Sequence, residues 1–110
     1  MSNREEILKK IRAGNFVENN GKVIRDINLL RHEFIALKKV YRVRAGELSE
    51  QEFLDCINYL SQEGYITLRD TVTKSDARLS DTNYTTLEAL VTGKGIRLLG
   101  GVIIDKMVDV

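Results

Sequence analysis

The sequence predicts an α+β fold that is mainly helical, built as one small domain of 110 residues. Two patterns support this fold class. Apolar residues recur at spacings of three and four from Ile27 to Tyr41, as on one side of a helix. The segment from Ser49 to Asp70 combines a helix-capping pattern, a glycine stop and an alternating strand. We expect three parts: an N-terminal helix and turn-rich arm over 1–24, a main domain over 25–101, and an apolar tail over 102–110.

The N-terminal part begins with a capping-box pattern, in which Ser2 is followed three residues later by Glu5. Apolar residues at helical spacing then continue as far as Gly14, so we predict a short helix over 2–13. The stretch 15–21 that follows, N-F-V-E-N-N-G, is rich in turn-forming residues. It is either a linker or a small hairpin closed by its Asn-Gly pair.

The longest predicted helix runs from about residue 25 to 42 and carries the central core stripe. The stripe consists of Ile27, Leu30, Phe34, Leu37 and Tyr41. Basic residues gather near the C-terminal end of this helix: Lys38, Lys39, Arg42 and Arg44. Cations near a helix C-terminus suit the helix dipole, which gives the cluster a structural explanation, and phosphate binding is the alternative.

The next helix is predicted over 49–63, with Ser49 as its N-cap and Glu52 completing a capping box. Its apolar face should pack on the 25–42 helix and consists of Phe53, Cys56, Ile57 and Leu60. The opposite face is polar and consists of Gln51, Asp55, Asn58 and Gln62. Gly64 supplies the left-handed residue that ends the helix.

An antiparallel pair of strands is predicted after this helix. The first strand covers 65–69, and residues 70–83 form a long loop in which Asp70, Asp76 and Asp81 offset Lys74 and Arg78. The returning strand covers about 84–91. A short helix capped by Thr92 follows; Gly93 and Gly95 would permit close backbone approach, and Gly100 and Gly101 would end the helix.

The tail 102–110, V-I-I-D-K-M-V-D-V, is too apolar to remain in solvent. It is expected either to pack on its own domain or to form a homodimer contact.

Catalytic, cofactor and metal sites are not expected. The single histidine, His32, is placed on a helix without ligand partners at metal-binding spacing, and the single cysteine, Cys56, is placed in the core. The Gly93-Lys94-Gly95 run lacks the spacer and the Gly-Lys-Ser/Thr ending of a phosphate-binding loop. We therefore expect no enzyme activity. The lone cysteine and the absence of an apolar N-terminal run predict a cytoplasmic protein that does not bind membranes.

The net charge of +1 hides a strong asymmetry along the chain. Residues 1–44 hold eleven Lys and Arg against five Asp and Glu, whereas residues 45–68 hold five acids and no Lys or Arg. A dipolar surface is expected, with its basic pole near the N-terminus.

The motif Y-L-S-Q-E-G-Y-I-T-L-R at residues 59–69, and L-V-T-G-K-G-I-R-L-L-G-G after a loop, resemble the winged helix-turn-helix superfamily over about residues 25–101. Its small size and its ending G-G-V-I-I-D-K-M-V-D-V also make the chain similar to short winged-helix proteins of Mu-like prophages. The resemblance implies a two-stranded wing and a DNA-binding regulator of transcription, and the predicted 2–13 helix would be an additional N-terminal helix. In one respect the chain departs from the superfamily: only residues 43–48 separate the two predicted helices, so the sequence leaves open whether the helix-turn-helix has a separate second helix.

If the docking of that superfamily applies, the polar face of the 49–63 helix would meet the major groove of duplex DNA through Gln51, Asp55, Asn58 and Gln62. Phosphates would be held by basic residues outside that helix: Arg4, Lys9, Lys10, Arg12, Lys38, Lys39, Arg69, Lys74 and Arg78. The acidic surroundings of the 49–63 helix favour a different function, in which this helix or the apolar tail binds a protein partner. Both hypotheses are retained.

Overall fold

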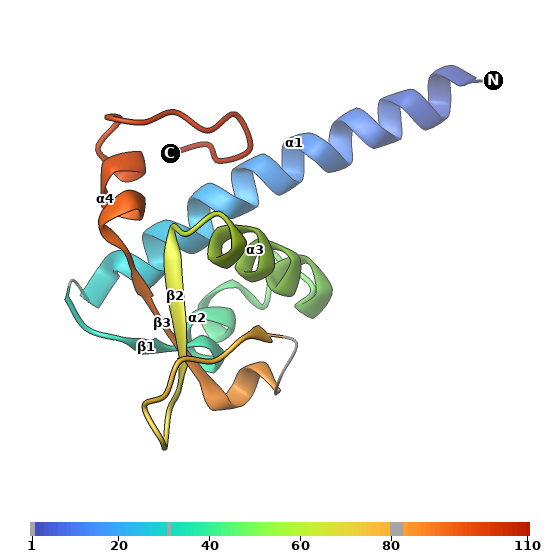
Figure 1. Cartoon of the computed structure of the whole chain (residues 1–110). Helices are drawn as coiled ribbons and strands as arrows, with labels where there is room; N and C mark the ends of the chain where they lie inside the picture. The colour runs from blue at the N-terminus through green and yellow to red at the C-terminus, as the bar shows by residue number, and fades with distance from the viewer. Residues whose placement is uncertain (1, 31, 80–82) are drawn as a thin grey trace.

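The structure is a computed structural model that describes residues 2–30, 32–79 and 83–110, with side chains from residue 15 onward. It is an α+β fold, about half helical, so the predicted fold class is confirmed at this level (Figure 1). The elements are α1 (Ser2–Ile27), η1 (Asn28–Leu30), β1 (Ile35–Ala36), α2 (Leu37–Arg44), α3 (Glu50–Gln62), β2 (Ile66–Asp70), η3 (Tyr84–Thr86), β3 (Leu87–Val91) and α4 (Gly93–Leu99).

The strands form one antiparallel sheet in the order β1-β3-β2, so β3 is central and β2 lies at an edge. β2 pairs with β3 along its whole length, with Leu68 opposite Ala89. β1 is short and pairs Ile35 with Ala89 and Ala36 with Glu88. Helices α1 and α3 pack on each other, α1 also contacts β3, and α2 lies against β1 and β3.

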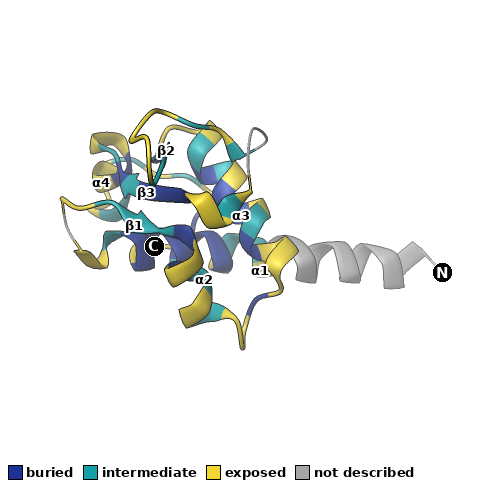
Figure 2. Cartoon of the chain, turned by 90° about the horizontal axis from the view of Figure 1, so that it is seen from below, coloured by how far each residue is buried: buried dark blue, intermediate teal, exposed yellow. Residues whose placement is uncertain are grey.

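The hydrophobic core lies between the helices and the sheet (Figure 2). The apolar face predicted for the 49–63 helix is buried completely: Phe53, Cys56, Ile57 and Leu60. The helix that packs against α3 is α1, which buries Val23, Ile24 and Ile27. α1 is thus the main partner in place of the expected 25–42 helix, although Phe53 also contacts Tyr41 of α2, with ring centroids 5.2 Å apart.

α1 corrects the prediction of a 2–13 helix followed by a linker or hairpin, because the helix continues without a break to Ile27. Asn20 and Gly21, read as a turn pair, are buried within α1 beneath the C-terminal tail. Asn20 Nδ2 donates to the Met107 carbonyl oxygen at 2.9 Å, and Gly21 lies directly against the Asp109 carbonyl oxygen. Gly21 thus serves close packing between backbones and not a turn.

The predicted 25–42 helix is also wrong, because α1 ends at Ile27 and the chain then turns into β1 before starting α2. His32 has a positive φ of 71° and is exposed in this turn, so it does not lie on a helix. Leu30, assigned to the core stripe, is 49% exposed. α2 is a separate helix before α3, joined to it by residues 45–49, so the second helix that the sequence left open is present. The observed order of elements is compatible with a winged helix.

The local predictions around α3 are confirmed. Ser49 accepts a hydrogen bond from the Glu52 amide at 3.1 Å, and the Glu52 side chain accepts from the Ser49 amide at 3.0 Å. Gly64 has the predicted positive φ, 79°. β2 follows as expected, while β3 starts at Leu87 because residues 84–86 form a 3-10 turn.

α4 begins at the predicted cap. The Thr92 hydroxyl accepts from the Gly95 amide at 3.1 Å and donates to the Gly64 carbonyl oxygen at 2.5 Å. A Cβ at Gly95 would overlap the Tyr65 carbonyl oxygen, which confirms the predicted close approach there. At Gly93 a Cβ would meet only the flexible end of Arg97, so no close backbone approach exists at that position.

The tail after α4 folds back on its own chain. The Asp105 carboxylate accepts hydrogen bonds from the Tyr59 and Tyr65 hydroxyls, each at 2.7 Å. Val108 is buried, and the Asp109 amide donates to the Val17 carbonyl oxygen of α1 at 3.1 Å. These contacts tie the tail to α1, α3 and the segment before β2. A homodimer through residues 102–110 stays a prediction.

Replacing Gly95 with Ala should lower the free energy of unfolding by about 1–3 kcal/mol, because the added methyl group must displace the Tyr65 carbonyl or the Val91 side chain. The matched control is Gly46→Ala, where no atom lies within 4 Å of the added carbon. The control should be neutral or slightly stabilising. Urea unfolding measures both variants, and equal stability of the two would contradict the packing described here.

The Tyr65 hydroxyl should make stability fall at alkaline pH. Burial and the hydrogen bond to Asp105 raise the pKa of Tyr65 from 10.0 to about 12. A group whose pKa is higher in the folded state stabilises the fold fully below its unfolded pKa, and this contribution is lost as pH rises from about 10 to about 12. Over this pH range, the free energy of unfolding of Tyr65→Phe should fall by about 1–2 kcal/mol less than that of the wild type.

The control for this measurement is Tyr41→Phe, because the Tyr41 hydroxyl donates to the Leu48 carbonyl oxygen and not to Asp105. Chemical denaturation across the alkaline range gives the free energy of unfolding for each protein. A Tyr65→Phe curve parallel to the wild-type curve would show that the hydrogen bond to Asp105 has no such role.

Candidate functional site

The polar face of α3 is exposed, as the sequence predicts. Gln51, Asp55, Asn58 and Gln62 all lie on the solvent side of the helix. They form two hydrogen-bonded pairs, and the two residues of each pair lie one helical turn apart. Gln51 Nε2 donates to Asp55 Oδ1 at 2.8 Å, and Gln62 Nε2 donates to Asn58 Oδ1 at 3.2 Å. The second pair leaves Asn58 Nδ2 and Gln62 Oε1 available, a donor and an acceptor side by side.

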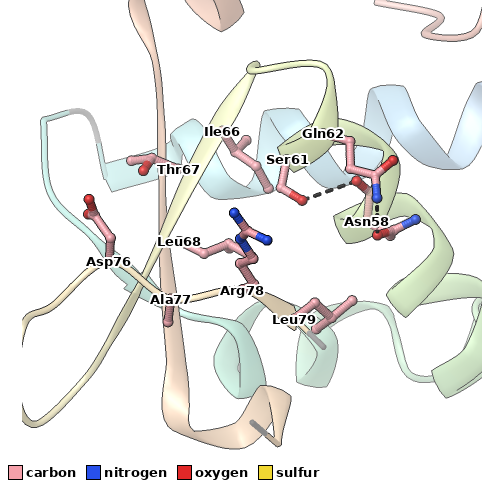
Figure 3. Close-up of a pocket in the computed structure, with 10 residues that line it drawn as sticks. All are labelled: Asn58, Ser61, Gln62, Ile66, Thr67, Leu68, Asp76, Ala77, Arg78 and Leu79. Carbon is pink, nitrogen blue, oxygen red and sulfur yellow. Dashed lines mark hydrogen bonds between the residues drawn. The ribbon is translucent and has the colours of Figure 1, made fainter. Parts of the chain in front are cut away.

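A groove of about 550 Å³ lies between this face of α3 and the edge of β2 (Figure 3). We call it the α3–β2 groove. Its lower wall is the extended segment 76–79, which runs beside β2 through an isolated bridge between Arg69 and Asp76. The lining residues are Asn58, Ser61, Gln62, Ile66, Thr67, Leu68, Asp76, Ala77, Arg78 and Leu79.

Arg78 is the predicted cation that reaches this groove. Figure 3 shows its side chain extending from the 76–79 segment toward Ser61 of α3. Arg78 is exposed and makes no ion pair within the part of the chain that the structure describes. Three of the predicted site residues, Asn58, Gln62 and Arg78, are thus brought together.

Arg69 and Lys74 are held elsewhere, by the carboxylate of Glu88 in the central strand. Arg69 Nε lies 2.6 Å from Glu88 Oε1, and Lys74 Nζ lies 3.0 Å from the same atom. The Arg69 guanidinium also covers the Phe34 ring, 3.5 Å from its centroid. Burial alone would raise the pKa of Glu88, but the hydrogen bonds from Lys74 and Arg69 outweigh it and the pKa is lowered. The single charge of Glu88 is therefore shared between these two predicted phosphate contacts and offsets one of their two positive charges.

The basic cluster near α2 divides in two. Lys38 and Lys39 are exposed and form no ion pair with any described residue. Arg44 instead holds Asp26 of α1 through two contacts of 2.6 and 3.0 Å. Arg44 therefore joins α2 to α1, whereas Lys38 and Lys39 face solvent as predicted, and so does Arg42, which is exposed and forms no ion pair with any described residue. The side chains of Arg4, Lys9, Lys10 and Arg12 lie outside the described residues.

Sequence reasoning missed Glu88 and the edge of β2 as parts of this region. Glu88 stands opposite Arg69 in the β2–β3 register, so a cross-strand charge pair was the available signal. Ser61 and Thr67 also line the groove without having been singled out. No local pattern marked these two hydroxyl groups.

Chemistry that would indicate catalysis is not found in the described part of the chain. Within it, no group of three or more His, Cys, Asp or Glu side chains is placed to hold a metal ion. Burial raises the pKa of the Cys56 thiol to about 12, so the thiolate is not formed at neutral pH. A second cavity of about 470 Å³ is mostly apolar, lined by residues such as Leu90, Ile96 and Leu99. None of the described helices has the length and apolar character needed to cross a bilayer.

Comparison of this chain with known protein families, curated proteins and solved structures finds no match.

Substituting Gln for Glu88 should lower the free energy of unfolding by about 1–2 kcal/mol, because Arg69 loses a charged partner while it stays partly buried. The lowered pKa of Glu88 determines the direction of the pH dependence. The stabilisation by Glu88 is complete above its unfolded pKa of 4.5 and is lost as the pH falls through its lower folded pKa. Wild type should therefore lose more stability on acidification than the variant does.

Glu33→Gln is the control, because Glu33 is exposed and has no side-chain partner among the described residues. Urea unfolding at neutral and acidic pH measures all three proteins. Equal stability of Glu88→Gln and Glu33→Gln at neutral pH would contradict a stabilising role for the Glu88 ion pairs.

Proposed function

We propose that this chain is a non-enzymatic winged-helix protein that binds duplex DNA and acts in transcription regulation. The observation that carries the proposal is the α2–turn–α3 arrangement with an exposed row of amide side chains on α3. In such an arrangement the second helix lies in the major groove, where Asn and Gln side chains pair with adenine. The antiparallel β2–β3 pair with its long connection would be the wing.

Phosphate contacts would come from cations outside α3. Lys38 and Lys39 on α2 and Arg78 beside the α3–β2 groove are exposed and carry no ion pair among the described residues. Arg69 and Lys74 would contribute less, since they share the carboxylate of Glu88, which offsets one of their two charges. DNA affinity should therefore be modest and strongly dependent on salt, because few phosphates are neutralised.

Binding is tested by fluorescence anisotropy with a labelled duplex of mixed sequence, titrated at several salt concentrations. Reversing two charges with Lys38→Glu and Lys39→Glu should weaken binding at low salt by about tenfold or more and reduce the salt slope by about two. The matched control is Arg97→Glu with Lys106→Glu, which makes the same change in net charge. Arg97 lies on α4, at the end of the sheet opposite the 76–79 segment.

The proposal is wrong if wild-type protein forms no complex with the duplex at low salt and micromolar protein. It is also wrong if the control pair weakens binding as much as the α2 pair does, because binding would then reflect net charge alone. Circular dichroism of each variant verifies that the fold is retained.

A protein-binding role for α3 is the second candidate. It is favoured by the five acids and the absence of Lys or Arg over residues 45–68, which surround the exposed face of α3. A complementary partner surface would be basic. Under this hypothesis Asp55→Lys should weaken capture of the partner, whereas under the DNA hypothesis the same substitution should strengthen DNA binding.

A further inference from the structure

The N-terminal half of α1 extends beyond the rest of the fold. In the other half, Phe16 packs edge-on against Tyr59 of α3, with ring centroids 5.7 Å apart, and the Val17 carbonyl oxygen accepts from the Asp109 amide at 3.1 Å. From there toward the N-terminus the helix runs away from the sheet and the other helices (Figure 1). At 1.5 Å per residue, the stretch 2–14 is roughly 20 Å long. Packing on the chain's own core therefore does not account for this half of the helix.

In the packed half, the two sides of α1 differ clearly. The inner side is apolar and buries Val23 and Ile27 against the core. The outer side is polar, and its residues Asn15, Glu18 and Arg25 are exposed. This is the ordinary pattern of a helix on the surface of a fold.

In the N-terminal half the pattern is reversed. Steps of three and four residues stay on one side of a helix. Steps back from Asn15 on the outer side lead to an apolar set, which we call the outer strip: Ile7, Leu8 and Ile11. Steps back from Phe16 on the inner side lead through Ala13 to two charged residues, Lys9 and Glu6. The apolar residues beyond the fold are thus on the side turned away from the core, which indicates contact with another molecule.

The charges that border the outer strip match those of a second copy in the reverse orientation. Glu5 lies three residues before Leu8 and Arg12 lies four residues after it, so both border the strip on the same side. If two strips pack antiparallel, with Leu8 of each copy opposite Ile11 of the other, Glu5 of each copy comes beside Arg12 of the other. A parallel pairing would form no such ion pair and would place Arg4 of one copy against Arg4 of the other.

We propose that two copies of the chain pair in antiparallel orientation through the outer strips of their α1 helices. The two folds then lie at opposite ends of the paired helices. Because α3 packs on the inner side of α1, its polar face stays free in each copy. The interface is small, so the dimer is weak and forms in the micromolar range. It differs from the predicted contact through residues 102–110, and it does not depend on DNA binding.

The dimer is tested by sedimentation equilibrium of the full chain without DNA, across the micromolar range. Ile11→Glu should weaken dimerisation by about a hundredfold or more, because each dimer loses two buried apolar side chains and gains two buried charges. The matched control is Ile104→Glu in the tail, where the side chain is 89% exposed. The control should dimerise like the wild type. Thermal melting followed by circular dichroism verifies that both variants keep the fold.

Charge reversal tests the orientation. Glu5→Lys should weaken the dimer by about fivefold or more at low salt, because two attractive pairs become repulsive. Adding Arg12→Glu to the same chain should restore dimerisation, since each pair then forms again with its charges exchanged. Glu33→Lys, which makes the same change in net charge as Glu5→Lys at an exposed turn residue, should have little effect.

The proposal is overturned if wild-type protein stays monomeric throughout the micromolar range. It is equally overturned if Ile104→Glu weakens the dimer as much as Ile11→Glu does, because the tail would then be the interface. Failure of the double reversal to restore dimerisation would rule out the antiparallel pairing.

Discussion

The position of α3 against the sheet depends on one junction, where the end of α3 meets the start of α4. The Thr92 hydroxyl donates to the Gly64 carbonyl oxygen and accepts from the Gly95 amide, while the Thr92 amide donates to the Tyr65 carbonyl oxygen. Gly95 must lack a side chain, because a Cβ there would overlap Tyr65. Since only Glu63, Gly64 and Tyr65 separate α3 from β2, this junction sets the distance between the two walls of the α3–β2 groove.

The parts of the fold that could be predicted are those encoded by neighbouring residues. The capping box at Ser49 and Glu52 and the cap at Thr92 each join a side chain to a backbone amide three residues away, and the positive φ at Gly64 depends on that residue alone. Because these interactions do not depend on distant packing, the boundaries of α3 and α4 and the position of β2 follow from the sequence. The polar face of α3 follows from the same periodicity.

The errors arise where distant packing overrides a local pattern. Gly21 is typical of a turn in sequence, yet it lies within α1 because the backbone at Asp109 packs against it, 88 positions later in the chain. Phe34 fits a helical stripe, yet it lies beneath Arg69, and the next two residues pair with β3. The prediction of the site failed for the same reason. Arg69 and Lys74 were predicted to bind phosphate, and their actual partner, Glu88, was missed because it lies on another strand.

The remaining charge distribution bears on how α3 can act. With Arg69 and Lys74 sharing the one carboxylate of Glu88 and no basic residue between 45 and 68, the cations left to attract phosphate to α3 are mainly Arg78 beside it and the exposed basic residues of α2. Asn58 and Gln62, however, are uncharged and can bond equally to base edges or to a peptide backbone.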